Sequence, residues 1–106
     1  MKGGPGGMQN LMKQANQLQM KIKKLQEELA HKEYQATSGG GAVTVKVRGE
    51  SEVIDLKITE EVMKSSDVEM LQDLIVTATN EALRTAKTTN AKEMEKLTGG
   101  FSFPGL

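Results

Sequence analysis

The chain has 106 residues and a mass of about 11.5 kDa, which is the size of one domain. Its 14 basic and 14 acidic residues give a net charge of zero. Only 37% of its residues are hydrophobic, so an aliphatic core and a partner subunit are expected. Cysteine is absent and His31 is the only histidine, which excludes disulfides, thiolate nucleophiles and cysteine-ligated zinc sites.

The N-terminal residues 1–7 are mostly glycine and are predicted to form a flexible leader. They lack the apolar run of a signal peptide, and no window of the chain approaches 18 apolar residues. One domain is expected over residues 8–98, with an apolar tail at residues 99–106. We therefore expect a cytoplasmic protein without a membrane partner.

An unbroken heptad repeat of apolar residues follows the leader. Its members are Met8, Leu11, Ala15, Leu18, Ile22, Leu25 and Leu29. This spacing predicts a helix over residues 8–34 that is about 40 Å long. The apolar stripe is either intramolecular core or the seam of a self-association interface, and the length of the helix favours the seam.

A three-stranded antiparallel sheet is predicted next. The glycines at 39–41 mark a turn, because a phosphate-binding glycine loop requires a helix after it and here a strand follows. Residues 43–47 alternate valine with polar residues, as in a half-buried strand. A hairpin at residues 49–50 leads to a strand whose core face is Ile54, Leu56 and Ile58, with Val53 on the other face. Residues 34–37 supply the third strand.

Two helices complete the predicted fold, which is α+β. Residues 59–64 form a short helix, and Ser66 with Glu69 forms a capping box that opens a second long helix. This helix is expected to end at Gly99–Gly100. Its first half carries an apolar stripe for packing on the sheet: Val68, Leu71, Leu74, Ile75, Ala78, Ala82, Leu83 and Ala86. Its second half is more basic and should emerge from the sheet.

Catalytic groups are missing from the sequence. The acidic pairs Glu60–Glu61 and Asp67–Glu69 fit helix N-terminal charges better than acid catalysis, since nothing apolar near them would raise a pKa. His31 has no cysteine or second histidine at ligand spacing, so a solvated histidine at a helix end is favoured. We predict that the protein is not an enzyme and has no cofactor, metal or small-molecule substrate.

The zero net charge conceals an uneven distribution. Residues 1–32 carry six lysines and two glutamates, for a charge of +4, and the remainder carries −4 with its acids concentrated in residues 49–81. An anionic partner would therefore meet the basic end, with the acidic middle turned away. Such a set of lysines on a helix is ordinarily a solvated face, and the residues alone favour that interpretation slightly over a nucleic-acid-binding face.

The sequence as a whole resembles the YbaB/EbfC family of bacterial nucleoid-associated proteins. The resemblance is carried by the order of Gly39-Gly40-Gly41, residues 43–47, residues 67–75, Asn80-Glu81-Ala82, and a Gly99-Gly100 tail ending in Pro104-Gly105. It implies an intertwined homodimer with protruding helical arms, located in the nucleoid. It also implies binding of double-stranded DNA with a change in DNA conformation, and a role in nucleoid organisation and gene regulation.

Specific residues can be assigned to these functions. Apart from Tyr34 at the predicted end of the first, neither long helix has aromatic residues for stacking on bases, which favours duplex phosphates over single strands. The predicted DNA-binding residues are Lys13, Lys21, Lys23, Lys24, Arg84, Lys87 and Lys92. The predicted dimer interface comprises Leu11, Ala15, Leu18, Ile22, Leu25, Val45, Leu71, Leu74 and Ile75. The alternative function is an adaptor for recombination or replication proteins, with incidental DNA contact.

Overall fold

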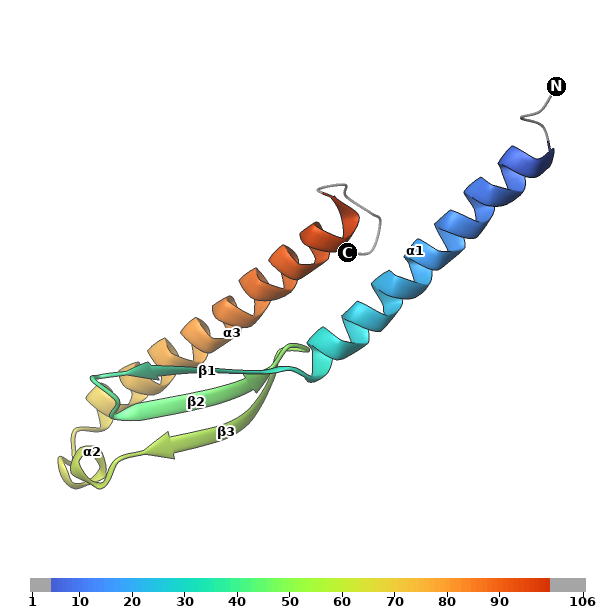
Figure 1. Ribbon diagram of the computed structural model, residues 1–106. Coiled ribbons are helices and arrows are strands. Elements are labelled where there is room, and N and C mark those ends of the chain that lie inside the picture. Colours follow the sequence, from blue (N-terminus) through green and yellow to red (C-terminus); the bar gives the residue numbers. More distant parts are fainter. Residues whose placement is uncertain (1–4, 100–106) are drawn as a thin grey trace.

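The computed structural model describes residues 5–99 of an elongated molecule that measures 79 × 18 × 18 Å (Figure 1). Its radius of gyration is 21.0 Å, whereas a compact chain of this length would have about 13 Å. The elements are α1 (Pro5–His31), β1 (Glu33–Ser38), β2 (Val43–Arg48), β3 (Glu52–Ile58), α2 (Glu60–Lys64) and α3 (Val68–Thr98). This order confirms the predicted combination of helices and sheet.

The core lies between the sheet and the first half of α3. The sheet has the order β1-β2-β3 with both pairs antiparallel, and α3 lies against β1 and β2. Three valines of β2 face α3 and have no exposed surface: Val43, Val45 and Val47. Three buried alanines at intervals of four residues belong to the same core: Ala78, Ala82 and Ala86. Their small side chains allow the helix to lie close to the sheet.

Val45 therefore belongs to the interior of this chain. The predicted place of Val45 in a dimer interface is wrong, because the alternation along β2 puts its side chain on the face that α3 covers. No surface of Val45 remains for a partner to contact.

The third strand differs from the prediction. The register shifts between Lys46 and Val47, so that Val53 pairs with Val47 and Leu56 pairs with Val45. Because directly paired residues share a face of a sheet, the irregularity moves Val53 to the face of Leu56. The helix leaves β3 uncovered on this side, and Val53 and Leu56 stay 49% and 44% exposed.

The turn between β1 and β2 agrees with the prediction. Gly39, Gly40 and Gly41 all have positive φ, between 60° and 96°, which is a conformation that L side chains rarely adopt. A side chain at Gly39 would also lie 2.9 Å from a methyl group of Leu74. The glycine run is thus required by backbone geometry and by close packing on α3.

Both limits of α1 and the start of α3 differ from the prediction, whereas α3 ends at Thr98 with Gly99 as its C-cap, as predicted. Helix α1 begins at Pro5, within the predicted flexible leader, since proline is well suited to the first turn of a helix. It ends at His31 because Tyr34 pairs with Val47 in the sheet. The N-cap of α3 is Asp67, whose carboxylate accepts a hydrogen bond from the Met70 amide, rather than Ser66. Residues 1–4 and the tail from residue 100 onward lie outside the described residues.

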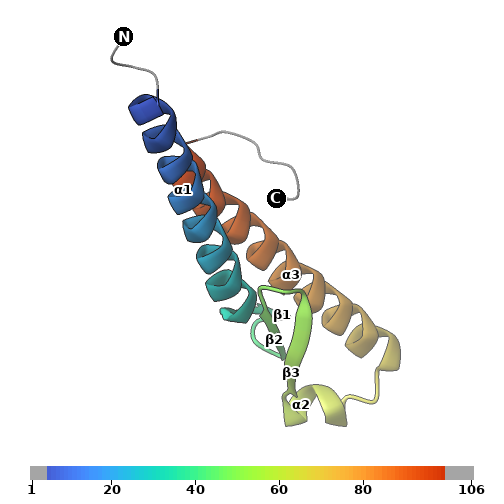
Figure 2. The same cartoon turned by 90° about the vertical axis from the view of Figure 1, so that its right-hand side faces the viewer.

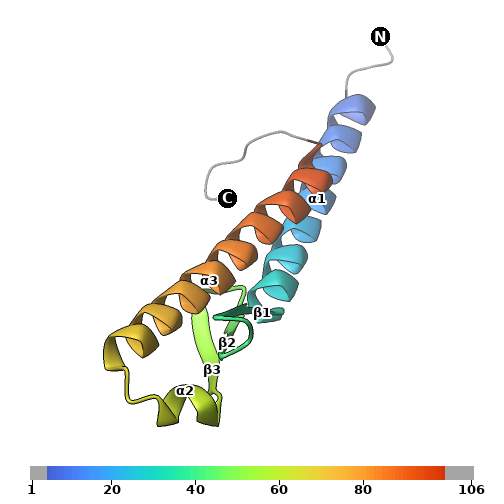
Figure 3. The ribbon, with the colours of Figure 1, turned by 90° about the vertical axis from the view of Figure 1, so that its left-hand side faces the viewer.

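Helix α1 and the second half of α3 extend past the sheet at one end of the molecule, whereas α2 lies at the other end (Figures 2 and 3). The burial of the heptad stripe changes along α1. Leu29, beside the sheet, is only 6% exposed, and Leu18, Ile22 and Leu25 are half-buried. Leu11 is 63% exposed. The chain itself therefore covers only one end of the predicted stripe.

Candidate nucleic-acid interface

The four predicted DNA-binding lysines of α1 are all exposed. Within residues 5–99, no carboxylate lies within 4.0 Å of an ammonium group of Lys13, Lys21, Lys23 or Lys24. Their charges are therefore available to an external anion. They do not share one face, however, because a two-residue separation places Lys21 and Lys23 about 160° apart around the helix axis.

The predicted basic residues of α3 are also exposed, but they are less uniform. The guanidinium of Arg84 donates a hydrogen bond to the Glu81 carboxylate, so part of its charge is balanced within the helix. Lys87 lies on the same exposed side one turn later, and Lys92 follows beyond the sheet. Arg84 is thus the weakest of the three candidates.

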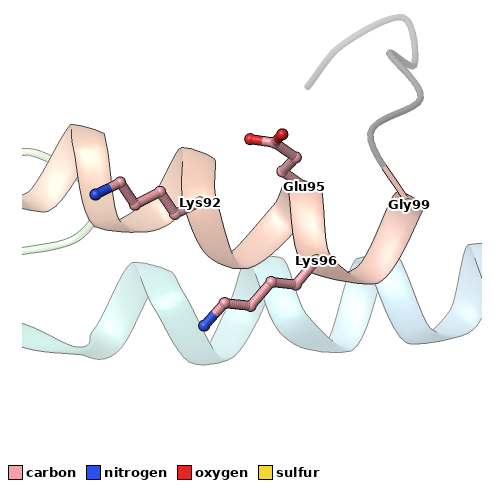
Figure 4. Close-up of a pocket in the computed structure, with 4 residues that line it drawn as sticks. All are labelled: Lys92, Glu95, Lys96 and Gly99. Atoms are coloured by element: carbon pink, nitrogen blue, oxygen red, sulfur yellow. The ribbon is translucent and has the colours of Figure 1, made fainter.

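A hollow of about 390 Å³ lies near the C-terminal end of α3 and includes one cation that the prediction missed. Lys92, Glu95, Lys96 and Gly99 line it. Figure 4 shows Lys92 and Lys96 extending back toward the sheet, while Glu95 points away from Lys96. The four-residue spacing of Lys92 and Lys96 could have indicated this pair in the sequence. Lys96 also lies 3.3 Å from the Glu93 carboxylate.

The long axis of the molecule separates charges of opposite sign. Residues 8–26 of α1 contain four lysines and no acidic residue. The opposite end contains α2 and the start of α3, where five acids accompany one lysine, Lys64, for a net charge of −4 (Figure 1). We name residues 59–73 the acidic pole. The electrostatic field therefore favours an anion at the α1 end and opposes one at the acidic pole.

The remaining predicted interface residues are at least partly accessible. Leu11 and Ala15 are exposed. The six others are half-buried: Leu18, Ile22, Leu25, Leu71, Leu74 and Ile75. The three on α3 also pack against the core. Further apolar side chains that the prediction did not assign to an interface are also exposed: Val53, Leu56, Met63 and Val68. The irregular register of β3 and its uncovered position explain why alternation alone did not identify the first two.

Features of other kinds of site are sparse in the described part of the chain. Between residues 5 and 99, no group of three or more acidic or histidine side chains is placed to hold a metal ion. No helix in that range is long and apolar enough to cross a membrane. His31 is exposed, and its Nδ1 lies 2.8 Å from the carbonyl oxygen of Glu27 in the preceding turn.

Comparison with known proteins shows the family to which the chain belongs. A model of the YbaB/EbfC DNA-binding family matches residues 3–101. The chain belongs to this family. It is 50% identical over 104 residues to a nucleoid-associated protein of Clostridium kluyveri, covering 98% of this chain and 91% of that relative. It is also 50% identical over 108 residues to one of Caldanaerobacter subterraneus, covering 99% and 97%.

The fold of this YbaB/EbfC protein also resembles a solved structure. The crystal structure of an uncharacterized Helicobacter pylori protein aligns with a TM-score of 0.70 at 22% identity, covering 84% of this chain and 94% of that one. The resemblance stated from the motifs is confirmed, and so is the prediction that the protein is not an enzyme, because the family is a DNA-binding one.

Proposed function

We propose that this protein is a nucleoid-associated homodimer that binds double-stranded DNA mainly through phosphates and changes the conformation of the DNA. In this proposal it acts in the cytoplasm, within the nucleoid, and contributes to nucleoid organisation and gene regulation. The observation that carries the proposal is the set of four exposed α1 lysines that no carboxylate of residues 5–99 pairs with. They lie at the end of the molecule opposite the acidic pole, in a chain of a DNA-binding family.

Phosphate contact is supported by the chemistry of the exposed groups. The α1 candidates are lysines with intervening glutamine and asparagine, and all three side chains can donate hydrogen bonds to phosphate oxygens. Tyr34 is the only aromatic residue between positions 5 and 99, and it is buried. Stacking on exposed bases, as in single-strand binding proteins, therefore has no platform in the described part of the chain.

The homodimer is supported by the apolar surface that one chain leaves open. The N-terminal half of the α1 stripe and the uncovered face of β3 include exposed large hydrophobic residues, among them Leu11, Val53 and Leu56. Burial of apolar surface is the main favourable contribution to most protein association. Two copies related by a two-fold axis would present two sets of α1 lysines to one duplex.

A gel-shift titration tests the proposal. The full chain is titrated with several unrelated duplexes at two salt concentrations, and the binding constants are compared. We expect similar affinities for all duplexes and a steep loss with salt, because each neutralised phosphate contributes a log–log slope of about −0.9. An adaptor with incidental DNA contact would instead fail to bind duplexes or heparin at low salt, and that outcome would refute the proposal.

A further inference from the structure

Three segments distant in sequence meet at the base of α1. They are the last turn of α1, the β2–β3 turn at residues 49–51, and α3 near Asn90. The Gly49 amide donates a hydrogen bond to the Lys32 carbonyl at 2.8 Å, and the Glu50 amide donates to the Ala30 carbonyl at 3.2 Å. The final carbonyls of a helix have no partner within it, so the β2–β3 turn satisfies the end of α1.

Asn90 ties this turn to α3 and to the sheet. Its Nδ2 donates to the Gly49 carbonyl at 3.1 Å, and its Oδ1 accepts a hydrogen bond from the Tyr34 hydroxyl at 2.9 Å. Tyr34 is only 8% exposed. Its burial and the nearby Glu93 carboxylate raise the pKa of the phenol, so the hydroxyl stays protonated and can donate at neutral pH.

Gly49 is required by space rather than by backbone conformation. A Cβ atom at this position would lie 1.8 Å from the carbonyl oxygen of Leu29 and 3.2 Å from the Asn90 amide nitrogen. Any side chain would therefore push the β2–β3 turn away from α1. We name Tyr34, Gly49 and Asn90 the hinge cluster.

The direction of α1 has large consequences at its far end. Leu29 is buried beside the hinge cluster, but most of the helix beyond it is exposed. Lys13 lies 16 residues from Leu29, or about 24 Å along the helix. A tilt of about 10° at the base of α1 would therefore move Lys13 by about 4 Å. This displacement is larger than the range over which hydrogen-bond lengths vary.

We propose that Tyr34, Gly49 and Asn90 are positioning residues. They hold α1 at a set direction relative to α3, and this direction selects the shape of the bound duplex. This inference rests on the proposed function, because it assumes that the α1 lysines contact phosphates. It assigns to the hinge cluster no contact with DNA. Loss of the cluster should therefore change the DNA bend and leave the number of phosphate contacts nearly the same.

The absence of cysteine allows a direct test by spin labelling. Gln14→Cys on α1 and Glu95→Cys on the second half of α3 provide two exposed label sites. Pulsed electron spin resonance then gives the distance distribution between the labels, and an excess of unlabelled chain suppresses distances between protomers. The same proteins without labels are used to measure DNA bending, by energy transfer between the ends of a duplex, and the salt dependence of binding.

Three variants perturb the hinge cluster and one serves as a control. Tyr34→Phe removes a single hydroxyl, Asn90→Ala removes both side-chain hydrogen bonds, and Gly49→Ala introduces the clash. Thr88→Ala changes an exposed residue of α3 outside the cluster. We expect the three cluster variants to broaden or shift the distance distribution and to change the bend angle. The salt slope should stay at the wild-type value, and Thr88→Ala should match wild type throughout.

The outcomes separate this inference from the proposed function. Distance distributions identical to wild type in Tyr34→Phe and Asn90→Ala would overturn the positioning role, whether or not DNA binds. Altered distances with an unchanged DNA bend would overturn the selection of duplex shape. Failure of the wild-type protein to bind any duplex would instead refute the proposed function. If Asn90→Ala or Gly49→Ala does not fold by circular dichroism, Tyr34→Phe decides alone, because it retains the aromatic ring.

Discussion

Two regions of the molecule can be compared: the body, which consists of the sheet and α3, and the N-terminal half of α1. Both have a regular pattern of apolar residues, but that pattern is buried in the body and exposed in α1. In the body, the alternating valines of β2 are fully buried against α3. In α1, the heptad stripe is equally regular, yet Met8 and Leu11 are both more than 60% exposed. Periodicity therefore predicts the element in both regions but does not predict what buries it.

The two regions should accordingly contribute to different properties. The body contains the only completely buried large side chains of the described residues, so its packing should dominate the free energy of unfolding. The exposed half of α1 adds little to folding of one chain and offers apolar and basic surface to partners. Substitutions that separate folding, association and DNA binding can break or sharpen this comparison.

The largest effect on stability is expected in the body. Val45→Ala removes two methyl groups from a site with no exposed surface and should lower the free energy of unfolding by about 2–3 kcal/mol. Met20→Ala on α1, at a site 72% exposed, should change it by less than about 0.5 kcal/mol. Urea denaturation measures both, and equal losses would contradict the division into two regions.

The stripe of α1 should control association. Ile22→Asp places a carboxylate in the half-buried stripe and should weaken the dimer by roughly ten- to a hundredfold, or about 1–3 kcal/mol. Met20→Asp is the matched control, since it adds the same charge to the same helix off the stripe. Sedimentation equilibrium gives the dissociation constants.

A wild-type mass near 11.5 kDa at micromolar concentration would contradict the homodimer altogether. Equal weakening by Ile22→Asp and Met20→Asp would mean that added charge, rather than the stripe, controls association.

The parts of the fold that were predictable depend on local pattern, and the remainder depends on contacts between distant residues. The heptad and the valine alternation are local, so α1 and β2 were found from the sequence. The irregularity that moves Val53 to the face of Leu56 depends on pairing between two strands. The N-cap at Asp67 instead of Ser66 depends on the local backbone, with Ser66 at a φ of 59°.

The features of the candidate site can also be divided into those that local sequence pattern predicts and those that depend on contacts between distant residues. Exposure of the α1 lysines could be inferred from their outer heptad positions, and all four are exposed. The hinge cluster could not be inferred, because Tyr34 and Asn90 are 56 residues apart and carry no motif. Val45 was assigned to an interface because sequence alternation does not say which face of a sheet its own helix covers.

The basic surface of α1 should determine the salt dependence of DNA binding. Replacing Lys21, Lys23 and Lys24 together with glutamine should weaken binding to all duplexes about equally. Since Lys21 and Lys23 lie about 160° apart, one duplex cannot contact all three, and the log–log slope should become shallower by about 1–2 for each copy of α1.

Lys57→Gln combined with Lys64→Gln is the charge control, because both lysines lie toward the acidic end of the molecule. If the α1 variant keeps an intact dimer and an unchanged salt slope, its lysines are only a solvated face. The DNA-binding site would then lie on α3 or on the sheet.

Alkaline pH should weaken the junction between α1 and the body by removing a donor. The pKa of Tyr34 is raised above 10.0, chiefly by burial and further by Glu93. A raised pKa favours the neutral phenol in the folded state, so its contribution to stability is complete below pH about 10 and is lost as the pH rises through the folded-state pKa. Unfolding measured against pH should show this loss in wild type and not in Tyr34→Phe.

Neutralisation of the acidic pole should have the smallest effect. Glu60→Gln, Glu61→Gln and Asp73→Asn together remove three negative charges from the end of the molecule away from the α1 lysines. Screening over a Debye length of about 8 Å at physiological salt limits repulsion of a duplex bound at the α1 end. Duplex affinity in the gel shift should therefore increase only slightly, and more at low salt. A large increase, or a crosslink from this segment to DNA, would place the duplex beside the acidic pole and reverse the proposed orientation.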